Sequence, residues 1–405
     1  MLHNTTQTMS RNWRIGDKEY AYLKEVLDGG FPGSSRVNFL ARLEAAFAEK
    51  FDCRYAISHA NGTATLHAAL AAAGVRPGDE VIVPPLTMAS TSLAVLHQGA
   101  VPVFADVDPE TFLIDPESIA SRITPRTRAI IPVALYGLAP DLDAIMSLAA
   151  AHNLTVVQDA AQCFLGTYQG KTVGSIAHLA SFSFQNSKHI TCGEGGMVTT
   201  DDRELADRVA RFSSLGYGLV SAGAGKSKID KRQILHPSFK RHVTFGFNYR
   251  MSELCAAVAL AQLERLDEFV AWRKRSAETL SQVVADCPWL TPQRIPEECE
   301  HSFWAYVVRM EPDRGAPAWD RFYDKFVELG GEGFYGAWSL TYLEPTFQDG
   351  TVFQDKANAR AYPPGLCPVA EDLQPRLVQF KTNQGNQATL DRQAECLAET
   401  IRFFG

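Results

Sequence analysis

The region between residues 81 and 200 alternates short apolar runs with segments of helical spacing, and this pattern constrains the fold more than any other feature of the chain. Strands that alternate with helices predict an α/β fold, in which a mainly parallel sheet is covered by helices on both faces. Such sheets bind ligands at the carboxyl ends of their strands. The predicted strands are 81–86, 101–107, 129–135, 154–158, 180–184 and 197–200, and the predicted helices include 91–97, 142–152 and 201–214.

The length of 405 residues exceeds what one ordinary core supports, so more than one domain is expected. We predict an N-terminal arm and helix over 1–35, a large domain over 36–270 and a smaller C-terminal domain over 271–405. A strong helical pattern over 253–272 would bridge the last two. The sequence also predicts helices over 17–27, 37–51 and 388–404, a strand over 305–310, and a long loop rich in Gly, Ser and Lys over 216–243.

Composition excludes several classes of protein. The net charge of −7 argues against a nucleic-acid surface, which requires a basic stripe, and no apolar run approaches the length of a membrane span. Residues 1–15 lack the apolar segment of a secretory signal. The eight cysteines form no C-x-x-C pair, so neither a zinc site nor a disulfide framework is indicated. We therefore expect a cytoplasmic protein with reduced thiols, no metal and no membrane or nucleic-acid partner.

One lysine lies where a parallel sheet places functional groups. Lys188 follows the apolar run 179–184 and precedes the glycine cluster 193–196, and Asn186 and Ser187 indicate that the chain has left the strand. A buried amine has a lowered pKa, and its free lone pair suits Schiff-base chemistry. The alternative is an ordinary solvated loop lysine, because lysine is rarely buried.

Two further motifs occupy comparable positions. The small-residue turn at Gly62 and Thr63 opens an Ala/Leu-rich helix, whose N–H groups and dipole suit a phosphate, although any helix needs such a cap. Asp159 follows the strand 154–158, where an acid is also typical of a turn or a helix cap. Because these motifs and Lys188 lie at strand ends or a helix start, we expect them to converge on one site.

Pyridoxal phosphate (PLP) has binding requirements that this set of residues meets. The set is Gly62, Thr63, Asp159, Ser183, Lys188 and the segment 248–250. The phosphate of PLP requires N–H and hydroxyl donors, its protonated pyridine nitrogen requires a carboxylate, and its aldehyde requires a lysine. In the order and spacing of its motifs the chain resembles the DegT/DnrJ/StrS family of sugar (or cyclitol) aminotransferases. The matching segments are Asn61-Gly-Thr-Ala-Thr-Leu-His67, Gly78-Asp-Glu-Val-Ile-Val-Pro84, Phe104-Ala-Asp-Val-Asp108, Tyr136-Gly137, Gln158-Asp-Ala-Ala-Gln162, Ser181 to Gly196 and Phe247-Asn-Tyr-Arg-Met-Ser-Glu253.

The resemblance implies fold type I of the PLP-dependent transferases, which is aspartate-aminotransferase-like. It has a large domain around a mainly parallel sheet and a smaller C-terminal α+β domain. The resemblance also implies a homodimer with shared active sites. By the same resemblance Lys188 forms the Schiff base with PLP and Asp159 pairs with the pyridine nitrogen. The other cofactor-binding residues that it implies are Gly62, Thr63 and Ser183 at the phosphate, Asn248 reaching the phosphate from the other subunit, and Gln162 beside the ring.

The chain departs from the family pattern in two places. After Thr87, family members carry an aromatic residue that stacks on the ring, whereas this chain has Met88, whose thioether can cover a ring or fill the core. The segment 333–342 is aromatic and unlike the family's substrate segment; it contributes Tyr335 and Trp338 as candidate substrate-binding residues, or is simply a packed strand and loop. Arg250 is a third candidate, which would meet an anionic substrate or form a structural ion pair.

The predicted reaction is a transamination in a biosynthetic pathway. An amino donor, L-glutamate or L-glutamine, displaces Lys188 from the cofactor, and Lys188 then moves a proton as base and acid. Pyridoxamine phosphate then aminates a keto-sugar or keto-cyclitol; the form Ser-Phe-Gln-Asn-Ser-Lys slightly favours the cyclitol-type members. The alternatives are a dehydratase of the same family, in which His replaces the lysine, and a non-catalytic PLP-binding sensor. Lys188 is present and His189 follows it, which favours transamination.

Overall fold

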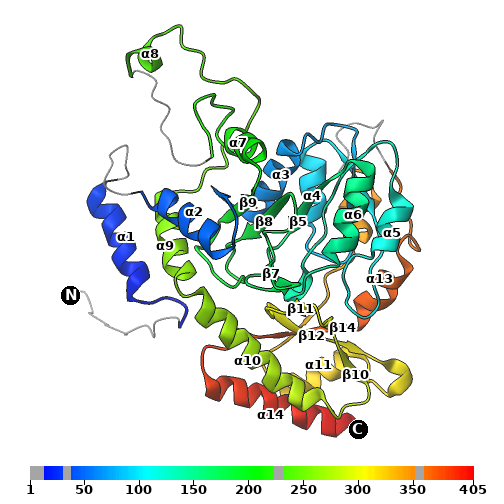
Figure 1. Ribbon diagram of the computed structural model, residues 1–405. Coiled ribbons are helices and arrows are strands. Elements are labelled where there is room, and N and C mark those ends of the chain that lie inside the picture. The colour runs from blue at the N-terminus through cyan, green and yellow to red at the C-terminus, as the bar shows by residue number, and fades with distance from the viewer. Residues whose placement is uncertain (1–12, 31–37, 223–230, 352–359) are drawn as a thin grey trace, which may run out of the picture.

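The computed structural model describes residues 13–30, 38–222, 231–351 and 360–405. Parts of the predicted arm over 1–35 and of the predicted loop over 216–243 therefore lie outside the described residues. Figure 1 shows a body built around a large sheet, with a smaller sheet and two long helices, α10 (Leu266–Val284) and α14 (Gln387–Phe404), at its lower end.

The large sheet has seven strands in the order β1-β9-β8-β5-β4-β2-β3. The strands from β8 to β3 pair in parallel, whereas β9 is antiparallel to both β8 and β1. The prediction of a mainly parallel sheet is therefore confirmed, and β1 is a strand that the sequence pattern missed. The bounds are β1 (Tyr55–His59), β2 (Glu80–Val83), β3 (Val101–Phe104), β4 (Thr127–Ile130), β5 (Thr155–Asp159), β8 (Leu179–Ser183) and β9 (Gly196–Thr200).

Successive side chains of the buried strands point to opposite faces of the sheet. In β2, Val81 and Val83 pack in one core with α3, α4 and α7, and Ile82 packs on the other face with α5 and α6. The second face continues over β8 and β9, where Phe182 packs with α2 and α9. The helices are α2 (Phe39–Lys50), α3 (Gly62–Ala72), α4 (Ser90–His97), α5 (Pro116–Arg122), α6 (Leu142–His152), α7 (Arg203–Phe212) and α9 (Glu253–Leu263).

The predicted single helix over 253–272 was wrong, because α9 ends at Leu263 and α10 begins at Leu266. Arg265 between them has φ −112° and ψ 8°, outside the α-helical range. No glycine or proline marks this break. Helix α9 is buried on nearly all sides, whereas α10 buries a single stripe. The start of α10 still packs in the core of α9, and its later residues pack against the small sheet.

The small sheet is antiparallel, in the order β10-β12-β14-β13, and it packs against α10, α11 and α14. The chain after β13 returns to the large sheet, since Leu340, Tyr342, Phe347 and Tyr362 belong to the same core as β2 and α4. The domain boundaries at 35 and 270 stay predictions. The remaining bounds are β10 (Leu290–Pro292), β12 (Ala305–Met310), β13 (Tyr335–Gly336), β14 (Leu377–Lys381) and α11 (Trp319–Glu328).

The shorter elements complete the described chain. Helix α8 (Lys231–Leu235) lies within the predicted loop over 216–243, so that segment is not wholly irregular. No helix among the described residues has the length and apolar composition needed to cross a membrane. The other elements are α1 (Asp17–Gly29), α12 (Pro345–Gln348), α13 (Pro368–Leu373) and the three-stranded sheet of β6 (Thr167–Tyr168), β7 (Lys171–Thr172) and β11 (Cys299–Glu300).

Candidate active site

A cavity of about 760 Å³ opens beside the carboxyl ends of β5 and β8 and the start of α3. This is where ligands bind in open α/β sheets. Most of the residues singled out in the sequence lie together on its wall. They are Gly62, Thr63, Met88, Asp159, Gln162, Ser183, Lys188 and Trp338.

The start of α3 is held close to the end of β8. Asn61 caps the helix, its side-chain oxygen accepting the N–H of Ala64 at 2.8 Å. The N–H groups of Gly62 and Thr63 fall in the first turn, where a helix supplies no acceptor of its own. A Cβ atom on Gly62 would lie 2.7 Å from Cβ of Ser183, so only glycine permits this approach. The helix N-terminus and the Ser183 hydroxyl thus form a cradle suited to a phosphate.

Asp159 ends β5 and is 4% exposed. Its Oδ2 accepts the hydroxyl of Thr91 at 2.8 Å, and its Oδ1 accepts the N–H of Ala161 at 3.1 Å. Burial raises the pKa of Asp159, while these two hydrogen bonds and the charge of Lys188 oppose the rise. A cationic ring nitrogen beside the carboxylate would favour its charged form. The hydrogen bond from the Ala161 N–H is one that turn residues typically form. Asp159 therefore both stabilises a turn and lines the cavity.

Lys188 lies in the turn that joins β8 to β9, and it is 9% exposed. The alternative of a solvated loop lysine was therefore wrong. Its amine lies 4.9 Å from the ring centre of Trp304. Burial lowers the pKa of Lys188 from 10.5 to about 8, Asp159 opposes this shift and Arg273 adds to it. A neutral amine is thus accessible close to neutral pH, as nucleophilic and proton-transfer chemistry requires.

The cavity fits PLP on the chemistry of its wall. The α3 cradle offers donors for the phosphate, Asp159 offers a carboxylate for the ring nitrogen, and Lys188 offers an amine for the aldehyde. The hydroxyl of Thr87, also in this wall, is buried and has no hydrogen-bond partner among the described residues. Gln162 is fixed by the N–H of Tyr136, which donates to its side-chain oxygen at 2.8 Å.

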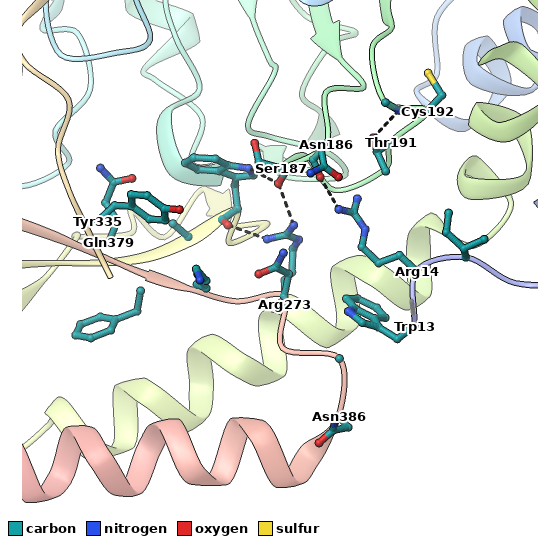
Figure 2. Close-up of a pocket in the computed structure, with 18 of the residues that line it drawn as sticks. Trp13, Arg14, Asn186, Ser187, Thr191, Cys192, Arg273, Tyr335, Gln379 and Asn386 are labelled. Atoms are coloured by element: carbon teal, nitrogen blue, oxygen red, sulfur yellow. Dashed lines mark hydrogen bonds between the residues drawn. The ribbon is translucent and has the colours of Figure 1, made fainter. Parts of the chain in front are cut away.

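Three predicted residues lie elsewhere. Asn248 and Arg250 are exposed and are not part of the cavity wall of this chain. Tyr335 is 62% exposed and lines a second cavity of about 860 Å³ (Figure 2), which shares Ser187 and Trp304 with the first. Met88 is 49% exposed on the wall of the first cavity, so it is not core filler.

Sequence reasoning missed several residues around Lys188. Trp304 lines both cavities, and Tyr249 lines the first, its hydroxyl lying 3.0 Å from Nδ1 of His67. Arg273 is buried on the apolar stripe of α10. A charged residue on an apolar stripe indicates a buried charge with specific contacts, so the sequence did contain a signal for Arg273. Arg14 also contacts the lysine turn, but no local pattern marks it. His189 is buried with Nε2 at 3.0 Å from the carbonyl of Ser302, and it does not line the first cavity.

The comparisons with known proteins now decide the family. The model of the DegT/DnrJ/EryC1/StrS aminotransferase family matches residues 14–388. The chain belongs to this family. It is 41% identical over 298 residues to the GDP-perosamine synthase of Caulobacter vibrioides, which covers 73% of this chain and 76% of that protein.

Solved structures agree with the family assignment. The aminotransferase from Psychrobacter cryohalolentis superposes with a TM-score of 0.85 at 32% identity and covers 96% of this chain and 98% of that one. A 3-amino-5-hydroxybenzoic acid synthase has a TM-score of 0.81 at 29% identity, covering 96% and 97%. The predictions of fold type I, of PLP as cofactor and of an aminotransferase are therefore confirmed.

Proposed function

We propose that this DegT/DnrJ/EryC1/StrS family member transfers an amino group from L-glutamate or L-glutamine to a keto-sugar. The observation that carries the proposal is that Lys188 and Asp159 face one cavity at the N-terminus of α3. That arrangement supplies the three groups that PLP requires, and the lowered pKa of Lys188 suits its amine to proton transfer.

PLP supplies the electron sink that makes a proton on the donor's α-carbon removable. The residues of the chain do the rest. The N–H groups of Gly62 and Thr63 and the hydroxyl of Ser183 would bind the phosphate, and the carboxylate of Asp159 would hold the proton on the ring nitrogen. Nζ of Lys188 takes the proton from the α-carbon and later donates a proton in return. Met88 would cover the ring, since it lies half-exposed on the cavity wall.

A nucleotide-linked keto-sugar is the acceptor that we favour. The GDP-perosamine synthase relative carries a nucleotide in its name, and its identity of 41% exceeds that of the 3-amino-5-hydroxybenzoic acid synthase. Trp338 lines the cavity, with its ring centre 6.0 Å from that of Trp304. Two such rings can pack on the apolar face of a sugar. A keto-cyclitol stays the second candidate, supported only by the sequence around Lys188.

We further propose a homodimer in which Asn248 reaches the phosphate of the other subunit, with Arg250 near its substrate. Both residues are exposed here, and Phe245 beside them is 77% exposed, as expected of a surface that is covered in an assembly. Mixing Lys188→Ala with Asn248→Ala tests this arrangement. Two inactive variants should regain part of the activity as a mixed dimer if sites are shared; no recovery in a confirmed mixed dimer would contradict it. Cytoplasmic location stays a prediction.

The direct test follows the visible absorption of the purified protein with PLP before and after addition of L-glutamate or L-glutamine. We expect the donor to bleach the cofactor band and a GDP-linked keto-sugar to become aminated, as measured by mass spectrometry. Lys188→Ala should abolish turnover, whereas Lys171→Ala, at an exposed lysine, should not. A product without added nitrogen would support a dehydratase. Tight PLP binding with no response to any amino donor would support a sensor.

A further inference from the structure

The backbone of the turn that carries Lys188 is bound by side chains from distant parts of the chain. Arg14, in the segment before α1, donates from Nη1 to the carbonyl of Asn186 at 2.7 Å. Its Nη2 donates to the carbonyl of Lys188 at 2.6 Å and to that of His189 at 3.2 Å. One guanidinium group thus spans three carbonyls of the turn, which its planar set of donors is suited to do.

Arg273 and Trp304 bind the same turn from two other elements. Arg273, in α10, donates from Nη2 to the carbonyls of Ser187 and Lys188, both at 3.4 Å. Trp304, just before β12, donates from Nε1 to the carbonyl of Ser187 at 2.9 Å. Figure 2 shows both guanidinium groups directed at this turn from the second cavity. With Arg14, every carbonyl from 186 to 189 therefore has a side-chain donor.

Arg273 is itself fixed in place. Its Nη1 donates to the carbonyl of Trp304 at 2.8 Å and to the hydroxyl of Thr382 at 2.9 Å. Across residues 13–30, 38–222, 231–351 and 360–405, no carboxylate forms an ion pair with Arg273. Burial, with a further contribution from Arg14, lowers the pKa of Arg273 to about 9. Arg273 therefore brings a buried positive charge, held by neutral hydrogen-bond acceptors, against the lysine turn.

We propose that Arg14 and Arg273 are positioning residues that fix the turn over 186–189 and so place the Lys188 amine for reaction. The second effect belongs to Arg273 and is electrostatic, because a nearby positive charge disfavours protonation of the amine. The charged or titratable groups around Lys188 are Asp159 from β5, Arg273 from α10, Arg14 from the N-terminal segment, and His189, which follows Lys188 in the chain. Burial and the charge of Arg273 lower the pKa of His189. The kinetic part of this inference rests on the proposed function, but the placement of Lys188 does not.

The test measures Lys188 in the cofactor-free protein. Trinitrobenzenesulfonate labels neutral amines, and mass spectrometry of the peptide that contains Lys188 gives its labelling rate against pH. Arg273→Gln should move the midpoint upward, and labelling at pH 7.5 should slow about fivefold to tenfold for a shift of roughly one pKa unit. Arg273→Lys keeps the charge, so its midpoint should stay near that of the wild type. Arg376→Gln, which removes contacts to Glu311 and Asp372 in the small sheet region, is the matched control.

A merely structural role gives a different result. If Arg273 only stiffens the protein, Arg273→Gln should label faster at every pH with an unchanged midpoint, and this would overturn the electrostatic part. With PLP bound, Arg273→Lys should lower kcat about tenfold with a smaller change in the donor KM, because a misplaced amine loses rate rather than binding. Wild-type kcat in Arg273→Lys and Arg14→Gln would overturn the positioning role. If Arg273→Gln does not fold by circular dichroism, Arg14→Gln and Arg273→Lys carry the test.

These readouts separate this inference from the function on which it partly rests. The wild type could show no transamination while Arg273→Gln still moves the labelling midpoint of Lys188. That result would refute the proposed function and retain the placement of Lys188. The wild type could instead transaminate while every arginine variant labels and turns over as the wild type does. That result would refute this inference alone.

Discussion

Replacing Lys188 with methionine should make the cofactor-free protein more stable at neutral pH. The buried amine is protonated there in both the folded and the unfolded chain, since its pKa is lowered only to about 8. The folded state therefore bears the cost of a buried charge. The difference between 10.5 and about 8 corresponds to about 3 kcal/mol of the free energy of unfolding at about 1.4 kcal/mol per pKa unit. Methionine has a similar length and carries no charge.

The sign of the pH dependence follows from proton binding. Between pH 8 and pH 10.5 the unfolded chain binds more protons at this residue than the folded one, so the stability of the wild type rises with pH relative to Lys188→Met. The advantage of the variant should thus be complete below about pH 8 and should disappear above about pH 10.5.

Guanidinium unfolding of both cofactor-free proteins at pH 7 and pH 10.5 measures this difference. Lys171→Met serves as the control, because Lys171 is exposed, and its effect should stay within about 0.5 kcal/mol at either pH. PLP must be absent, since a ligand that binds only the folded state adds its own stabilisation. An advantage of Lys188→Met that is the same at pH 7 and pH 10.5 would refute the claim that Lys188 is a buried charge.

Two further predictions concern the cofactor. Gly62→Ala should raise the Kd for PLP about tenfold, because its Cβ would lie 2.7 Å from Cβ of Ser183 and push the cradle open. Fluorescence titration with PLP measures this Kd. The control is Gly16→Ala, whose Cβ would meet its nearest atom at 3.4 Å, and it should leave the Kd unchanged. Thr91→Val should raise the pKa of Asp159 further, because the hydrogen bond from the Thr91 hydroxyl lowers it. The acid limb of the pH–rate profile should therefore move to higher pH. Asp159→Asn should lower kcat at least about a hundredfold at every pH. An unmoved acid limb in Thr91→Val would show that Asp159 does not set it.

The sequence predicted those parts of the site that local pattern controls. Asp159 and Lys188 each follow an apolar strand, and Gly62 opens a helix, so the rule that ligands bind at strand ends predicts that they share one site. Asn248 and Arg250 were assigned to the site from the family resemblance, and a single chain does not bring them to the cavity. The role proposed for them requires a second copy of the chain.

The contacts that hold the lysine turn could not be predicted from the sequence. Arg14 and Asn186 are 172 residues apart, and Trp304 and Ser187 are 117 apart, so no periodicity relates them. The break at Arg265 was missed for another reason. The helical pattern continues through it, whereas the chain leaves the core shared with α9 only along α10, whose later residues pack against the small sheet.

The return of the chain from the small sheet to the large one limits how the protein can be divided. Tyr342, Phe347 and Tyr362 belong to the core beneath β2 and α4, although they follow most of the small sheet in sequence. A fragment that ends near residue 270 would leave part of that core open to water, and a fragment that starts there would expose three aromatic side chains. We therefore expect neither half to fold stably without the other, so an exchange or a fusion should keep both together.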